Sequence, residues 1–177
     1  MGNAKENMID AFFELAQKKP VKTIKVKQVT DLANCNRCTF YQYFNDIYDL
    51  LDQAENQIVQ QIKIEVEKSY FSAASYEEIL VIMASACQKF GKILNLLMGP
   101  NGSPSFRNKY MNTLRPMISS IMKNKNLEYN DFIAEYALGA FISTVNYWCY
   151  HHDNMSAREL ASLIYKLTTK GVFPDCC

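Results

Sequence analysis

The sequence predicts an all-α protein in which three short N-terminal helices precede a larger body of longer helices. Apolar residues recur at the three- and four-residue spacing of a helix face, and no segment alternates as a strand would. Only 6 Gly and 5 Pro interrupt the 177 residues, which favours long helices over many short strands. Hydrophobic residues make up 49% of the chain, which is enough for a packed core and excludes a disordered protein.

The first helix is expected over residues 4–18, with Phe12 and Phe13 among its inward residues, and Pro20 ends it. The second helix is expected over residues 26–33. Its buried stripe follows the helical spacing and consists of Val26, Val29, Thr30 and Ala33.

Two asparagines mark a tight turn after the second helix. Asn34 lies where that helix must stop, and Asn is, after Gly, the residue that most readily adopts the left-handed conformation beyond a helix end. Asn36 is a strong N-cap for a third helix over residues 37–43. Two short helices joined by so tight a turn have the geometry that places the second helix in a DNA major groove.

The rest of the chain is expected to form a helical body. A long helix from Asp46 to about Lys68 carries one apolar face, and Ser156 with Glu159 forms a capping box before the last helix. Loops are expected at 69–75, 99–103 and 124–129, and helices over 76–98, 104–123, 130–150 and 156–170.

Several motifs carry a family resemblance. Asn36-Arg37, Thr39-Phe40-Tyr41-x-x-Phe44 and Tyr48-Asp49-Leu50-Leu51 lie within the run 24–51, which resembles the DNA-binding domain of TetR-family transcription regulators. Residues 96–106 and Tyr147-Trp148, followed by Ser156-x-x-Glu159-Leu160, look like the C-terminal domain of a TetR subgroup common in Gram-positive bacteria. The resemblance implies a helix-turn-helix DNA-binding domain over 1–45. It implies a connecting helix and a regulatory and dimerisation domain over 46–177.

Charge is distributed unevenly between these two parts. Residues 1–45 hold seven basic and four acidic side chains, a balance of +3, and the whole chain carries +1, which leaves −2 for the remainder. A mildly basic N-terminal part on a mildly acidic body fits DNA binding at one end.

Arg37 is the first candidate for a DNA contact, because it begins the third helix and an Arg can pair with guanine through two hydrogen bonds. Lys25 and Lys27 flank the start of the supporting helix. They are interpreted either as anchors for the DNA phosphates or as ordinary surface lysines. Phe40 and Phe44 are expected in the core. With the positions that the family pattern adds, the expected DNA contacts are Lys25, Lys27, Asn36, Arg37, Cys38, Thr39, Tyr41, Gln42 and Tyr43.

The chain departs from the family pattern at several of these positions. Related sequences usually have Gly in place of Cys38 and a capping Thr in place of Lys25. They usually have basic residues in place of Gln42, Asn45 and Ile47. Losing up to three phosphate-facing cations is expected to weaken DNA binding and its salt dependence.

We expect no metal, no cofactor and no catalytic residues. Cys35-x-x-Cys38 lacks the second pair of a zinc site and the preceding strand of a redox motif, and its thiols are expected to diverge. No nucleophile–base pair is apparent, so we do not expect an enzyme. A second group with metal-ligand chemistry lies at a helix end, where a His can simply satisfy backbone carbonyls: Cys149, His151, His152 and Asp153.

The chain is expected to be cytoplasmic and not to contact a membrane. Residues 1–20 are charged and amphipathic, unlike a signal peptide, and no apolar run approaches the ~20 residues of a membrane helix. The six cysteines show no disulfide-scaffold spacing, which indicates a reducing compartment.

The body offers candidate ligand and dimer residues. Methionine and aromatic side chains suit an adaptable pocket and equally a packed core, and the candidates for a pocket are Met83, Phe90, Tyr110, Met117, Phe141 and Trp148. In the resembling family, the last two helices of each subunit pair into a four-helix bundle. The residues expected in such an interface are Phe132, Tyr136, Ala140, Ser143, Leu160, Leu163, Ile164 and Leu167.

The resemblance implies a homodimeric regulator that binds a palindromic operator in double-stranded DNA. It implies a repressor that an unknown small-molecule effector releases from the operator. Two alternatives remain open: a regulator controlled by a protein partner, and a helical interaction module that has lost DNA binding.

Overall fold

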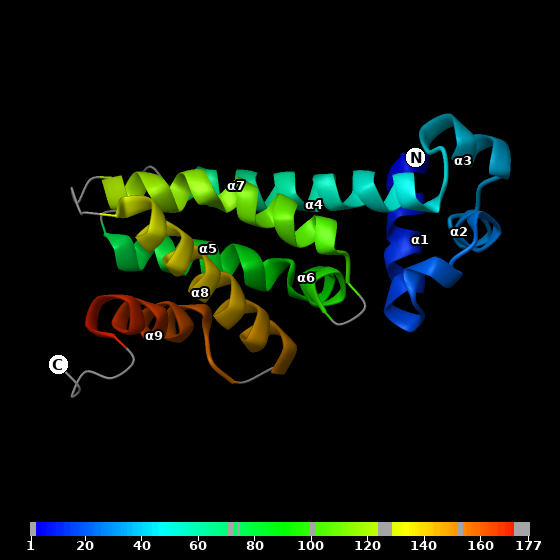
Figure 1. Cartoon of the computed structure of the whole chain (residues 1–177). Coiled ribbons are helices and arrows are strands. Elements are labelled where there is room, and N and C mark those ends of the chain that lie inside the picture. The colour runs from blue at the N-terminus through cyan, green and yellow to red at the C-terminus, as the bar shows by residue number, and fades with distance from the viewer. Residues whose placement is uncertain are drawn as a thin grey trace.

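The computed structural model describes residues 3–70, 73, 75–99, 102–123, 129–151 and 154–171. Across these ranges the chain forms nine α-helices and one short 3₁₀ turn, with no strand, so the predicted all-α class is confirmed. Figure 1 shows an elongated molecule with α1, α2 and α3 at one end, α5 to α9 at the other, and α4 running from the first group into the second. We call α1 to α3 the head and α5 to α9 the body.

The head packs around aromatic side chains. Phe12 and Phe40 are fully buried and Phe44 is 2% exposed, and the ring centroids of Phe40 and Phe44 lie 5.3 Å apart. Burying each such side chain contributes about 1.5–3 kcal/mol, so these residues hold α3 against α1 and α2 as predicted. The elements are α1 (Ala4–Lys18), η1 (Val21–Thr23), α2 (Val26–Leu32) and α3 (Arg37–Tyr43).

Helix α4 (Ile47–Tyr70) begins one residue after the predicted Asp46 because Asp46 is its cap. The Asp46 carboxylate accepts hydrogen bonds from the backbone N–H groups of Tyr48 and Asp49, each at 2.8 Å. Its predicted apolar face is buried and includes Leu50, Ala54, Ile58, Ile62 and Val66.

A buried ion pair joins α4 to α7. Glu55 is fully buried, and its carboxylate accepts hydrogen bonds from Lys109 Nζ and Ser105 Oγ, each at 2.9 Å. Lys109 also binds Asp52 at 2.6 Å. Because a buried carboxylate is costly without such partners, these contacts fix where α7 lies along α4.

The expected single helix over 76–98 was wrong. The chain instead forms α5 (Tyr76–Lys89) and α6 (Gly91–Met98), which are bent by 82° at a break at Phe90. Both helices are apolar, so the hydrophobic pattern does not indicate the break. Gly91 is the local sequence feature that does. A glycine inside a helix costs only about 1 kcal/mol relative to alanine. The bend turns α6 across α8 and brings it against α1.

The remaining helices are α7 (Pro104–Lys123), α8 (Asn130–His151) and α9 (Ala157–Lys170). The predicted capping box is confirmed, because Ser156 Oγ accepts from the Glu159 N–H at 3.2 Å and Glu159 accepts from the Ser156 N–H at 2.7 Å. In the body α5 packs on α9 and α7 packs on α8.

Where the chain is described, no single helix is long and apolar enough to cross a membrane. The bent pair α5–α6 meets that length and composition test only when its two helices are taken together.

Candidate nucleic-acid interface

The turn between α2 and α3 is held by backbone hydrogen bonds. Asn34 has φ 51°, the left-handed conformation that was predicted for it. The Cys35 N–H bonds to the Thr30 carbonyl at 3.0 Å and the Asn34 N–H to the Asp31 carbonyl at 3.3 Å. These are the two bonds of a Schellman motif, which ends α2 and redirects the chain.

Asn36 starts α3 as predicted. Its side-chain oxygen accepts from the Thr39 N–H at 2.8 Å and from the Thr39 hydroxyl at 3.0 Å. The first bond satisfies one of the free donors at the helix start. The second engages the Thr39 hydroxyl proton, so Thr39 offers DNA an acceptor rather than a free donor.

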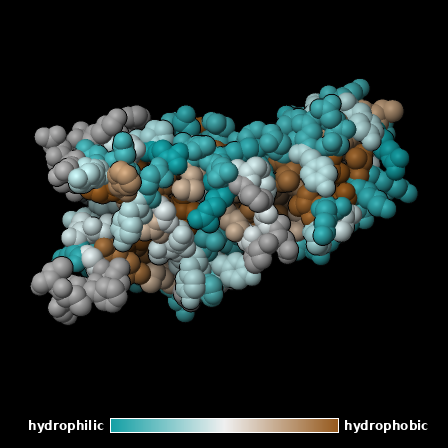
Figure 2. Space-filling model, in the orientation of Figure 1, coloured by the Kyte–Doolittle hydropathy of each residue, from teal (hydrophilic) through white to brown (hydrophobic). Residues whose placement is uncertain are grey.

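Helix α3 has one buried and one exposed side. Phe40 is fully buried beneath it, whereas Tyr41 is 58% exposed and Tyr43 40% exposed. Figure 1 shows α3 at the outer end of the molecule, and Figure 2 shows mostly hydrophilic residues covering that end. Arg37 forms no ion pair or side-chain hydrogen bond with any other described residue, so its guanidinium is free to bind.

The structure brings the nine predicted DNA contacts to the outer surface of the head. Thr39 is half-buried and the other eight are exposed: Lys25, Lys27, Asn36, Arg37, Cys38, Tyr41, Gln42 and Tyr43.

The three positions where related sequences usually carry basic residues differ in burial. Ile47 is only 8% exposed and packs in the core. Gln42 and Asn45 are exposed, and Asn45 also bonds to Asp49 at 2.8 Å. The expected loss of up to three phosphate-facing cations stays a prediction.

Gln28 is a supporting residue that the sequence reasoning missed. Its side-chain oxygen accepts from the Lys25 N–H at 3.0 Å and from Lys19 Nζ at 2.6 Å. A lysine side chain has no acceptor, so Lys25 cannot cap α2 as a threonine would. Gln28, at the third helical position, instead supplies one half of a capping box, because its side chain binds the backbone N–H of the cap residue. A Gln at that position is the sequence signal that could have indicated this contact.

Gln53 and Asp49 connect α3 to α4. The Gln53 side-chain amide donates to the Tyr43 carbonyl at 3.1 Å and to Asp49 Oδ1 at 3.0 Å. Asp49 Oδ2 accepts from the Asn45 N–H at 2.7 Å. This backbone bond, followed by the Gln53 bond, lowers the pKa of the Asp49 carboxyl. No sequence motif indicated these contacts.

The two head cysteines have different surroundings. Cys35 is half-buried against the head core, which raises the pKa of its thiol, and Cys38 is exposed. Neither is in a disulfide. Within the described ranges no three His, Cys, Asp or Glu side chains cluster to hold a metal ion. His151 Nδ1 lies 2.9 Å from the Tyr147 carbonyl, and His152 and Asp153 lie outside the described residues.

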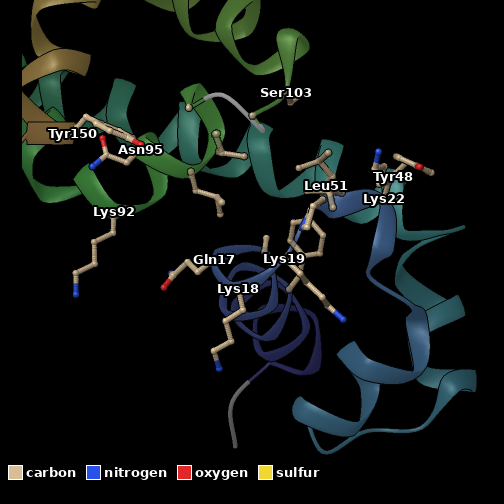
Figure 3. Close-up of a pocket in the computed structure, with 18 residues that line it drawn as sticks. Gln17, Lys18, Lys19, Lys22, Tyr48, Leu51, Lys92, Asn95, Ser103 and Tyr150 are labelled. Carbon is tan, nitrogen blue, oxygen red and sulfur yellow. The ribbon is translucent and has the colours of Figure 1, made fainter.

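The six candidate pocket residues lie in the body. Phe90 is half-buried and the other five are buried: Met83, Tyr110, Met117, Phe141 and Trp148. Tyr110 OH lies 2.7 Å from Cys87 Sγ, and Trp148 Nε1 donates to the Met155 carbonyl at 2.8 Å. None of the six lines either of two cavities of about 830 and 490 Å³. Figure 3 shows the larger cavity, which lies between α1 and α6.

The candidate dimer residues divide into two groups. Phe132 is 78% exposed, Tyr136 64% and Leu163 39%; Ser143 is also exposed, and Ala140 and Leu167 are half-buried. Leu160 and Ile164 are only 1% and 2% exposed. They are covered within their own subunit, where α9 packs on α5, so the structure does not make them available to a partner.

Figure 1 and the contacts above define a helix-turn-helix protein with a helical body. A family model described as "Transcriptional regulator C-terminal region", TetR_C_8, matches residues 74–170. The chain therefore belongs to the TetR family, whose members are transcription regulators rather than enzymes.

Solved structures share the whole fold. The TetR transcriptional regulator from Streptococcus agalactiae is 20% identical with a TM-score of 0.72, and 93% of each chain is covered. The fatty acid degradation regulator FadR from Bacillus halodurans is 17% identical with a TM-score of 0.77, and 97% of each chain is covered. FadR from Bacillus subtilis, in complex with stearoyl-CoA, is 16% identical with a TM-score of 0.74. That match covers 94% of this chain and 98% of the FadR chain. No curated protein matches in sequence.

Proposed function

We propose that this protein is a homodimeric transcriptional regulator that binds a palindromic operator through α3 and is released by a small molecule. The observation that carries the proposal is the exposed side of α3, where Arg37 and Tyr41 project from a helix whose other side Phe40 fixes in the core.

Each surface residue has a role that follows from its chemistry. Arg37 reads a guanine edge or clamps a phosphate at the first turn of α3. Lys25 and Lys27, exposed at the start of α2, anchor the phosphate backbone. Tyr41 and Tyr43 pack against the sugar–phosphate backbone or a thymine methyl group. We propose residues 1–45 as the DNA-binding domain and 46–177 as the regulatory and dimerisation domain.

The dimer is supported by the exposed face of α8. The face carries Phe132, Tyr136, Ser143, Tyr147 and Tyr150 at spacings of three, four and seven residues, which places them on one side of the helix. Gly139 lies on this face with no neighbour within 4 Å of its Cβ direction, so another helix can approach closely. On α9, Leu163 is exposed and Leu167 half-buried, and we propose that both join this interface.

The effector part of the proposal rests on the family. The FadR structure from Bacillus subtilis contains stearoyl-CoA, which shows that this fold accommodates a small molecule in that protein. We propose that effector binding shifts the dimer toward a conformation in which the two α3 helices no longer match the operator. Repression, a cytoplasmic location and the Gram-positive subgroup remain predictions from the sequence.

A helical interaction module without DNA binding is the second candidate, and the uncharged Gln42 and Asn45 favour it. An electrophoretic shift with the DNA upstream of the protein's own gene distinguishes the two. The proposal expects a discrete complex that resists excess non-specific DNA. A titration in which upstream and scrambled DNA bind alike, or neither binds, contradicts it.

A further inference from the structure

The larger cavity lies where the head meets the body. It has a volume of about 830 Å³ and opens between the C-terminal end of α1, the η1 turn and α6 (Figure 3). Apolar side chains from three separate elements line part of it: Phe12 from α1, Leu51 from α4, and Leu96 and Leu97 from α6. Its volume is within the range of small-molecule sites, which is about 300–1,000 Å³.

The polar part of the lining is positively charged. Lys18, Lys19 and Lys22 of the head and Lys92 of the body line the cavity, and none of the lining residues is Asp or Glu. Figure 3 shows the side chains of Lys18, from α1, and Lys92, from α6, extending in the same direction, with Gln17 between them. The cavity therefore combines an apolar wall with an excess of ammonium groups.

Contacts within the protein leave these charges largely available. Lys18 pairs with Glu14 at 2.7 Å, but these side chains are 67% and 52% exposed, and exposed pairs are weak. Among the described residues Lys92 forms neither an ion pair nor a side-chain hydrogen bond.

DNA binding does not account for this charge. Figure 1 shows α1 lying between α6 on one side and α2 and α3 on the other. None of the nine proposed DNA contacts lines the cavity. Lys18 and Lys92 therefore belong to a surface distinct from the proposed DNA contacts.

We propose that this cavity binds an amphipathic organic anion, a carboxylate, sulfonate or phosphate attached to an apolar body. The apolar part lies against Leu96 and Leu97 and the anion between Lys18 and Lys92. Such a ligand touches α1 and α6 at once, and it fixes the head relative to the body. Only this regulatory consequence rests on the proposed function, because binding itself requires no DNA.

The test uses the full-length protein and two fluorescent dyes with closely similar aromatic bodies. Anilinonaphthalene sulfonate carries an anion, and N-phenylnaphthylamine is neutral. The double variant Lys18→Gln/Lys92→Gln is expected to bind the sulfonate dye about fivefold more weakly, which is about 1 kcal/mol, and the neutral dye unchanged. Lys63→Gln/Lys68→Gln is the matched control, because it also removes two cations. Lys63 pairs with Glu67 at 3.8 Å and Lys68 with Glu65 at 3.1 Å, and neither lysine lines the cavity.

Salt provides a second measurement on the unmodified protein. Raising the ionic strength from about 0.05 M to about 0.5 M is expected to weaken binding of the sulfonate dye and to leave binding of the neutral dye unchanged, because salt screens only the charge interaction. Equal affinity of the two double variants for the sulfonate dye overturns the site. So does a Tyr147→Ser variant that loses the sulfonate dye, because the dye then binds the exposed face of α8. A protein that binds no operator but keeps this dye pattern contradicts only the proposed function.

Discussion

The side-chain amide of Gln53 donates a hydrogen bond to the backbone carbonyl of Tyr43 across 3.1 Å. Tyr43 is the last residue of α3, and Gln53 lies in the second turn of α4. The same amide bonds to Asp49, which in turn holds the Asn45 N–H. The helix proposed to read DNA is therefore attached to the helix that runs into the body, and we expect a displacement of α4 to change the orientation of α3.

Gln53→Ala tests this attachment. The variant is expected to lose about 0.5–1.5 kcal/mol of unfolding free energy and to bind the operator several-fold more weakly, although Gln53 is not a proposed DNA contact. Denaturant titration and fluorescence anisotropy measure the two effects. Gln60→Ala, an exposed position on the same helix, is the control. Equal operator affinity for the two variants would show that the bond does not orient α3.

Two substitutions of Asn36, the N-cap of α3, distinguish its effect on stability from its effect on DNA binding. Asn36→Ala removes the acceptor for the Thr39 N–H and is expected to destabilise the head by about 1 kcal/mol. Asn36→Asp keeps the acceptor, so thermal unfolding is expected to stay near that of the unmodified protein. Its added negative charge faces the DNA, so its operator affinity is expected to fall. An aspartate variant with unchanged affinity would place Asn36 away from the phosphates.

Asp49 is expected to contribute a pH-dependent part of stability. The pKa of its carboxyl is lowered in the folded protein, chiefly by the Asn45 N–H, so the ionised form is favoured by folding. That stability is present above the unfolded pKa of about 3.9 and is lost as the pH falls through the lower folded pKa. The difference in unfolding free energy between the unmodified protein and Asp49→Asn should therefore be largest near neutral pH and shrink in acid. A difference that is constant with pH is inconsistent with this account.

The proposed dimer face is tested at an exposed position, where a substitution spares the subunit's own core. Tyr136 is 64% exposed, and Tyr136→Arg is expected to place a cation in the seam between two α8 helices. Light scattering at micromolar concentration should then show a monomer, with operator binding weakened in parallel. Lys63→Arg, on α4, should remain dimeric. A Tyr136→Arg protein that stays dimeric excludes this face as the interface.

The sequence predicted best what short-range chemistry determines. Asn34 and Asn36 predicted the turn, because the left-handed preference of one and the capping preference of the other act within a few residues. Phe40 was expected in the core as part of the Thr39-Phe40-Tyr41-x-x-Phe44 motif.

Features that depend on distant neighbours were missed. The break at Phe90 lies in a run that is apolar on both sides, so periodicity does not register it. Leu160 and Ile164 match an interface pattern, but helical spacing does not say whether α5 or a partner subunit covers them. Lys18 and Lys92 line the same cavity, although 74 positions separate them in the sequence. The bend after α5 brings α6 against α1.

The central claim is that the exposed side of α3 reads operator DNA, and Arg37→Ala tests it most directly. Fluorescence anisotropy with the upstream operator is expected to show a loss of about 1–3 kcal/mol if Arg37 pairs with a guanine, with the thermal unfolding curve unchanged. Lys63→Ala serves as the charge-matched control and should bind as the unmodified protein does. An Arg37→Ala protein that folds normally and binds the operator with undiminished affinity would contradict the account.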